Sequence, residues 1–279
     1  MSIMEVVFVI IAALCLIVLA RWVLQWIFGY TLHDILTDHD NPAIGLAVAG
    51  YLFGVIWTIT VLLGAPSRGL WWDILDVLLY GGLGIILLTA VALMSCRFLL
   101  GLHVREQLEA HNVAAAIVVA GVYVATSLTY SGGLSGEGGG FWVLLLFFVL
   151  GQLALLGLTY AFRRLTGYDD VQQIASGNVA AALALAGLLI AIGVIVGHAA
   201  AGVFVSLGAS LLSFLLALLG VVVFYPVRQL VVQCLILGGP VRWGGTLLDH
   251  EIAADKNIAA GLLEATAYLS TALFITYIT

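Results

Sequence analysis

Charged side chains are scarce in this chain of 279 residues. Only 9% of its residues are charged, whereas a soluble domain carries about a quarter. So few charges cannot cover the surface of a soluble protein. We therefore expect most of the surface to face lipid, which makes the lipid bilayer the first expected partner. The nine basic residues form no stripe that could neutralise phosphates, which excludes nucleic acid as a partner.

Cysteines and the motifs of soluble enzymes are also lacking. Three cysteines provide no disulfide framework. The sequence has no phosphate loop, no nucleophile-elbow motif and no paired-histidine zinc motif, so we expect neither an enzyme nor a cofactor. One segment contains several side chains of the kinds that bind metals: His33, Asp34, Asp38, His39 and Asp40. The spacing of its histidines fits no zinc pattern, so we expect no metal site.

A ten-residue phrase, however, occurs four times. Each copy begins with an asparagine and continues as an apolar run rich in alanine and glycine; the copies are residues 41–50, 112–121, 178–187 and 257–266. The asparagines are 71, 66 and 79 residues apart. Self-similarity at such a period indicates one structural unit used four times. The fourth copy departs from the others at Glu264 and Thr266.

Eight apolar runs are long enough to cross a bilayer as helices, which takes roughly 20 residues. They predict an all-α polytopic membrane protein, with eight transmembrane helices forming four parallel two-helix repeats around a pseudo-fourfold or two-by-two axis. The first run carries Glu5 and no positive segment before it, so we expect a retained span, not a signal peptide. The runs are 4–27, 43–64, 75–96, 113–130, 141–162, 179–197, 202–225 and 258–278.

Two linkers stand out by composition. Residues 131–140 are rich in glycine and serine, which predicts a flexible linker outside the membrane. This linker divides the chain into two halves, 1–135 (repeats 1–70 and 71–135) and 136–279 (repeats 136–200 and 201–279). Residues 226–245 are too short and interrupted to span, so we expect an interfacial helix, with a re-entrant loop as the alternative.

The basic residues predict the orientation of the chain. Only Arg68 lies between repeats; the other eight lie in linkers within repeats, and are Arg21, Arg97, Arg105, Arg163, Arg164, Arg228, Arg242 and Lys256. Positive residues concentrate on the cytoplasmic side of a membrane. The long repeat linkers are therefore expected in the cytoplasm, and both termini outside.

The repeated asparagines have two compatible interpretations. An asparagine before an apolar helix is a preferred N-cap, because its side-chain oxygen accepts a bond from a free backbone N–H group. Four amides near four helix N-termini could also line a vestibule at a pore mouth. The residues concerned are Asn41, Asn112, Asn178 and Asn257.

Small residues recur four and eight positions after each asparagine. This spacing places them on one helix face and permits close helix approach in lipid. We therefore expect the second helix of each repeat to pack innermost. The pairs are Gly45 and Ala49, Ala116 and Ala120, Ala182 and Ala186, and Gly261 and Ala265.

Glu264 is the most informative single residue. Its counterparts in the other copies are Val48, Val119 and Leu185. A carboxylate within a membrane helix is costly and indicates a pore or polar site; the alternative is a hydrogen bond or ion pair between helices. Gln152, near the middle of the fifth run, is a second candidate for either role.

The third linker resembles the domain of unknown function 350 family. The resemblance rests on residues 165–169 (Leu-Thr-Gly-Tyr-Asp), 173–174 (Gln-Ile) and 177–182 (Gly-Asn-Val-Ala-Ala-Ala), with partial echoes at 28–31, 105–108 and 251–252. It implies a bacterial inner-membrane protein built from tandem two-span units. The family implies no established activity or catalytic residue, and some members are associated with membrane-stress systems.

Two functions fit these observations. The first is a channel or transporter for an ion or small polar solute, favoured by four parallel hairpins and by Glu264. The second is a non-conducting stress or scaffold component that docks partners through its cytoplasmic linkers. A second copy of the chain, or other membrane-associated proteins, would be those partners. A sealed bundle favours the second function, and a continuous polar path favours the first.

Overall fold

The computed structural model describes residues 3–29, 31–37, 40–101, 103–242 and 244–279. The predicted all-helical fold is confirmed over these residues. Predictions that involve Tyr30, Asp38 and His39 lie outside them. Eight helices in the described part are long and apolar enough to cross a membrane, and are Glu5–Ile27, Pro42–Leu63, Leu70–Leu99, Val113–Ser135, Gly140–Arg163, Val179–Ala200, Leu207–Ile236 and Ile258–Ile278.

The chain consists of four units with a common order of elements. Each has a long first helix, a short linker helix and a second helix that begins after the repeated asparagine. The first two units are α1 (Ile3–Phe28), α2 (Leu32–Thr37), α3 (Pro42–Leu63), and α4 (Leu70–Leu100), α5 (Val104–Glu109), α6 (Val113–Ser135). The third is α7 (Gly140–Arg163), α8 (Asp170–Ala175) and α9 (Val179–Ala200).

The fourth unit has a composite first helix. It runs without a break through α10 (Leu207–Leu218), a 3-10 segment η1 (Leu219–Val223), α11 (Phe224–Val227) and a π-helical segment η2 (Arg228–Ile236). Then follow α12 (Leu247–Ala253) and α13 (Ile258–Ile278). Pro226 lies between the two irregular segments; it has no N–H group to donate and its ring crowds the carbonyl four residues earlier, which distorts a helix at that point.

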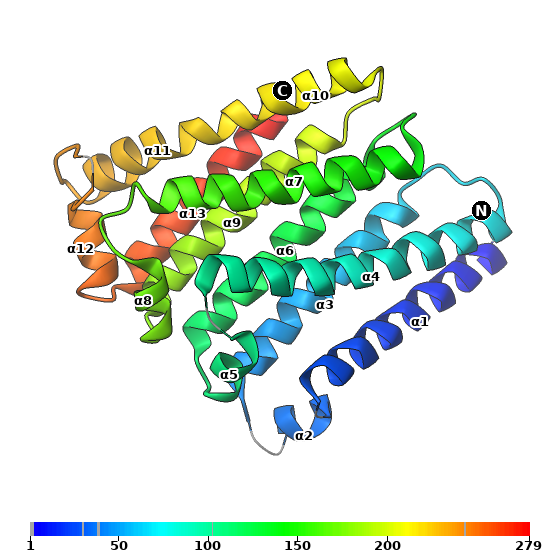
Figure 1. Cartoon of the computed structure of the whole chain (residues 1–279), viewed down its shortest axis with the longest axis horizontal. Coiled ribbons are helices and arrows are strands. Elements are labelled where there is room, and N and C mark those ends of the chain that lie inside the picture. The colour runs from blue at the N-terminus through cyan, green and yellow to red at the C-terminus, as the bar shows by residue number, and fades with distance from the viewer. Residues whose placement is uncertain (1–2, 30, 38–39, 102, 243) are drawn as a thin grey trace.

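The four second helices lie side by side in an open row, in the order α3, α6, α9, α13 (Figure 1). The two central helices, α6 and α9, are the most deeply buried of the eight spans. The helices α3 and α13 form the two ends of the row, and each leaves one side exposed. The predicted pseudo-fourfold or two-by-two axis is therefore not confirmed, because a row does not close around a centre.

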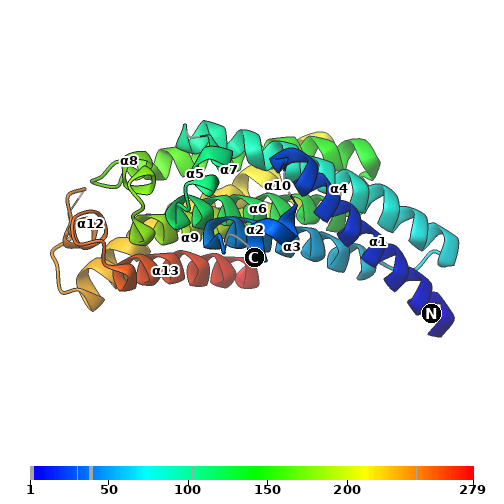
Figure 2. The same cartoon turned by 90° about the horizontal axis from the view of Figure 1, so that it is seen from below.

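The first helices cover one face of this row. Figure 2 shows α4 and α7 on the same side of α3, α6 and α9. The helix α4 packs against both α3 and α6, α7 against both α6 and α9, and the composite helix against α9 and α13. The helix α1 packs mainly against α4 and α3, and most of its surface is exposed.

The short helices α2, α5, α8 and α12 lie at one end of the row, which we call the linker end; both termini lie at the other (Figure 1). All four units therefore run in the same direction, as the sequence predicts for parallel repeats.

The linker predicted at residues 131–140 is wrong in extent. The helix α6 continues through Ser135, and Ser131 is only 2% exposed. Gly132 packs directly against the backbone of Gly197 in α9, which explains why a glycine continues the helix here. Only residues 136–139 connect α6 to α7.

The interfacial helix predicted within residues 226–245 is also wrong. Residues 228–236 instead continue the seventh span as the π-helical segment η2. The physical reason is burial: Arg228, Gln229, Val232 and Gln233 are all buried in the protein, where η2 packs against α12 and α13.

Candidate functional site

Each repeated asparagine is the N-cap of a second helix. The Oδ1 atom of Asn41 accepts hydrogen bonds from the backbone N–H groups of Ala43 (3.0 Å) and Ile44 (3.1 Å). Asn112, Asn178 and Asn257 cap α6, α9 and α13 in the same way. Each cap satisfies N–H groups that the first turn of a helix leaves unpaired.

The other half of each amide ties one unit to the next. The Nδ2 group of Asn41 donates to the carbonyl of Leu108 (2.9 Å), at the end of α5 in the second unit. Equivalent bonds run from Asn112 to Ile174 (2.9 Å) and from Asn178 to Ile252 (2.8 Å). Asn257 belongs to the last unit and donates to Glu251 of its own linker (2.8 Å). The amides are thus engaged in the row and do not gather around one vestibule.

Glycine packs on alanine at each step of the row. Gly50, Gly121 and Gly187 are the tenth residues of their phrases, and they lie against Ala120, Ala186 and Ala265, each the ninth residue of the next phrase. A Cβ atom on Gly121 would come within 2.9 Å of the Ala186 Cβ. Thr266 takes the glycine position in the fourth phrase, and its side chain is exposed.

The remaining small residues divide between the inside and the ends of the row. Ala116 and Ala182 are fully buried, and Gly261 packs against the backbone of Ala180. Gly45 is half-buried and Ala49 is exposed, because they lie on the free side of α3.

Glu264 is buried and paired. Its side chain is 2% exposed, and its Oε1 atom lies 2.7 Å from Nε of Arg228 in η2. The hydroxyl of Tyr268, one turn further along α13, donates to the same oxygen (2.7 Å). The carboxylate is therefore half of a buried ion pair between two helices, which was the alternative interpretation of this residue.

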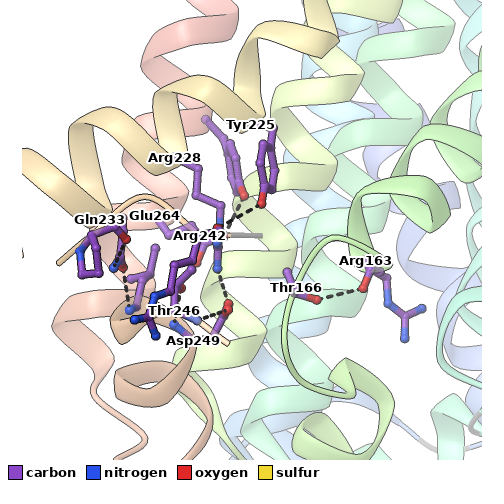
Figure 3. A network of polar contacts seen from close by, with 12 residues as sticks. Arg163, Thr166, Tyr225, Arg228, Gln233, Arg242, Thr246, Asp249 and Glu264 are labelled. Carbon is purple, nitrogen blue, oxygen red and sulfur yellow. Dashed lines mark hydrogen bonds and ion pairs between the residues drawn. The ribbon is translucent and has the colours of Figure 1, made fainter. Parts of the chain in front are cut away.

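Arg228 joins two carboxylates (Figure 3). Its Nη2 atom lies 2.5 Å from Oδ1 of Asp249 in α12, and its own side chain is 1% exposed. Asp249 is fixed in turn by a reciprocal capping box with Thr246 at the start of α12. Nearby, Gln233 accepts a bond from the backbone N–H of Leu248 (2.9 Å). The segment η2 thus fastens the fourth linker onto α13.

The third unit contains the same kind of ion pair. Nε of Arg163, the last residue of α7, lies 3.1 Å from Oδ2 of Asp170, the first residue of α8. Nη1 of Arg163 also donates to the carbonyl of Leu99 in α4 (2.6 Å). Asp170 and Asp249 each stand eight positions before the asparagine of their unit. This shared position is the sequence signal for the pairing, which our sequence analysis missed.

A small cavity of about 10 Å³ lies beside the two ion pairs. Asp170 and Glu264 both line it, together with apolar side chains of α9, of which Leu185 is one. Burial raises the pKa of Asp170 to about 6, although Arg163 opposes this rise, and the nearby charge of Glu264 adds to it. The two carboxyl groups therefore influence each other across the cavity.

Gln152 lies apart from this cluster. It is buried in α7, and its Oε1 atom is 3.5 Å from the hydroxyl of Thr126 in α6, the limit of a weak hydrogen bond. Its Nε2 group has no partner among the described residues. The structure thus separates the two polar residues that the sequence singled out.

The buried cluster could bind a proton or hold helices together. Within the described ranges, no three histidine, cysteine or acidic side chains are grouped so as to hold a metal ion. Arg163 is paired with one carboxylate and Arg228 with two.

The family of the chain is shown by its sequence. The family described as Domain of Unknown Function (DUF350) matches residues 1–134 and again residues 137–278. The resemblance seen in the third linker is therefore confirmed, and the two matches cover two units each. No curated protein and no solved structure matches the chain.

Proposed function

We propose, from the premise that the chain belongs to the DUF350 family, whose function is unknown, that it is a non-conducting component of a bacterial inner membrane. In this role it docks other proteins through the short helices at its linker end and carries out no catalysis itself. Its membrane character rests on the eight apolar helices.

The open row of second helices is the observation that carries this proposal. A pore through four parallel hairpins would need a shared axis, but the inner helices touch one another through glycine and alanine, at steps such as Gly121 on Ala186 and Gly187 on Ala265. Backbones this close leave no room for a solute between them. Glu264, the acid that favoured conduction, is held by Arg228.

The linker end offers a surface suited to protein partners. Its exposed side chains include both signs of charge, among them Arg105, Glu109, Asp255 and Lys256. Eight of the nine basic residues lie in the linkers or in the halves of the first helices nearest to them, which supports a cytoplasmic location for this end. Polar, mixed-charge surfaces are typical of the rims of non-obligate protein interfaces.

Ion flux through reconstituted vesicles tests the proposal. We expect wild-type protein to give no more flux than protein-free vesicles, for protons, sodium, potassium and chloride, at several voltages and pH values. In cells, a photo-crosslinking residue at the exposed Glu109 should then capture defined proteins, whereas one at Ser67, at the opposite end, should not. Flux above background, or equal capture at both positions, would contradict the proposal.

Conduction of a proton or small ion is the second candidate, and one observation favours it. Gln152, Thr159 and Thr166 are spaced seven residues apart, so they follow one face of α7 and the turn after it. Gln152 and Thr159 are buried, and Thr166 lines the cavity that Glu264 also lines. If wild-type vesicles conduct, Gln152→Leu should abolish the flux, and the exposed control Leu153→Ala should not.

A further inference from the structure

Five ionisable side chains meet at the linker end of the last two units. They are Arg163, Asp170, Arg228, Asp249 and Glu264, all largely or fully withdrawn from solvent. Three carboxyl groups thus face two guanidinium groups, which leaves one negative charge without a partner when all five are ionised. A buried charge without compensation is strongly unfavourable, and such a group takes up a proton or a counter-charge.

Two of the carboxyl groups line the same cavity. Asp170 reaches it from α8 and Glu264 from α13, and the cavity measures about 10 Å³, close to the size needed for one water molecule. The Oε2 atom of Glu264 is buried and receives no hydrogen bond from any described residue. An acceptor oxygen of this kind, buried beside a second acid, points to a ligand that supplies positive charge or a hydrogen.

A second cavity lies next to the first, at the linker surface. It measures about 290 Å³ and is lined by Arg163, Tyr168 and Asp170 together with the exposed side chains of Tyr160, Arg164 and Asp169. Arg163, Tyr168 and Asp170 also line the inner cavity. Asp170 therefore stands between the surface and Glu264.

We propose that Asp170 and Glu264 form a proton-binding site, which takes up one proton from water in the outer cavity and holds it on this carboxyl pair. Uptake forms an O–H bond on one carboxylate and cancels the excess negative charge of the cluster. A metal cation would need several more oxygen ligands, whereas within the described residues no group of three acidic, histidine or cysteine side chains is arranged for one. This proton-binding site goes beyond the proposed function. It does not depend on whether the protein is a non-conducting docking component or a conductor of ions.

The charged and titratable side chains around the site come from several elements. α7 provides Arg163, the following turn Tyr168, η2 Arg228, α12 Asp249 and α13 Tyr268, whereas α9 provides apolar side chains. The tyrosine hydroxyls stay neutral near neutral pH. Burial raises the pKa of Asp170 to about 6, so Asp170 is the member of the cluster through which a proton enters the pair.

Infrared spectroscopy of the purified full-length protein in detergent tests this site, because a protonated carboxyl group has its own C=O stretching band. We expect one buried protonated carboxyl group per chain, titrating roughly between pH 5 and 8. Asp170→Asn and Glu264→Gln should each remove this band. Both variants leave two acids facing two arginines, so the fold is expected to survive. Asp169→Asn is the matched control: Asp169 is exposed and caps α8, a role asparagine also fills, so the band should remain.

A change of charge beside the site gives a second readout that does not depend on those variants. Arg163→Gln removes a positive charge next to Asp170 and should raise the titration midpoint by roughly one to three pH units, whereas Arg163→Lys should leave it nearly unchanged. The midpoint should be equal in sodium and potassium salts. The proposal is overturned if the wild type shows no such band, if Asp169→Asn removes it, or if sodium displaces the proton.

Discussion

At the scale of single residues, the main feature is an arginine enclosed by two acids. Arg228 is 1% exposed and contacts Asp249 and Glu264. Such a cluster is not strong evidence of stability as a whole, because each charge has lost its hydration. The two acids depend on the arginine, however, since loss of Arg228 leaves both of them buried without a cation.

We therefore expect Arg228→Gln to destabilise the protein strongly. Two buried carboxylates would remain without their shared cation, at a cost of about 3–5 kcal/mol. Denaturant titration of the purified protein, monitored by circular dichroism, measures this loss. Arg242→Gln is the matched control, because Arg242 is exposed in the same linker and should change stability little. Equal effects of the two substitutions would show that the buried pairs add nothing.

Asp170 makes stability depend on pH in a defined direction. Its pKa is about 6 in the folded protein against 3.8 for an ordinary aspartate, so the folded state holds the proton more tightly than the unfolded state. Stability should therefore be greatest below pH 4 and fall as the pH rises to 6, by a total on the order of 3 kcal/mol.

The same titration series with Asp170→Asn checks this direction. Asparagine cannot ionise, so the fall between pH 4 and 6 should be reduced, and the variant should be more stable than wild type above pH 6. A variant that keeps the full pH dependence would rule out Asp170 as its source.

At the scale of helices, the repeated contact between second helices decides the packing. Glycine and alanine bring the backbones of α3, α6, α9 and α13 close together. In lipid, where apolar surface alone gives no preference for protein neighbours, such close contact is what holds helices together. Each step is also fastened at the linker end by an asparagine amide, such as that of Asn178 on the carbonyl of Ile252.

A large side chain at a glycine of the row should force the helices apart. Gly187→Leu would meet the Cα of Ala265, which lies 2.5 Å from the position of a new Cβ. We expect a loss of about 1–3 kcal/mol or more, measured as a lower midpoint of thermal unfolding in detergent. Gly157→Leu is the control, because no atom lies within 4 Å of its Cβ position and it is exposed on α7. If both variants unfold at the same temperature, close approach of α9 and α13 is unimportant.

The positions of the helices could be predicted from the sequence far better than the contacts between them. The apolar runs and the repeated asparagines mark the spans, because hydrophobic length and phrase similarity are local properties. Glu264 is visible as an acid among apolar residues, but Arg228 lies 36 positions away in a stretch that reads as a linker. The π-helical turn that buries Arg228 follows from packing around Pro226, which no local pattern contains. Similarly, a contact between glycine and alanine is compatible with a closed ring of helices as well as with an open row. The choice depends on how the first helices pack, such as α4 against α3 and α6, and α7 against α6 and α9.

At the scale of the whole molecule, all units point the same way, which makes the topology simple to test. In a cysteine-free background, a single cysteine at Glu137, between α6 and α7, should react with a membrane-impermeant reagent added outside cells. One at Gln172 in α8 should react only after the membrane is opened, because the positive residues place that end inside. Reaction of both positions from the same side would disprove this orientation.

The open row also bears on how such a protein could arise and change. A ring of helical units closes at a fixed number of units, because the angles between neighbouring units must together make a full turn. A row has no such requirement: a further unit could join at either end and meet the same surface as its predecessors. Gene duplication or deletion can therefore lengthen or shorten the row by whole units while the same Gly–Ala contact is used at each step. Thr266, which stands in the glycine position of the fourth phrase, is exposed on the free side of α13.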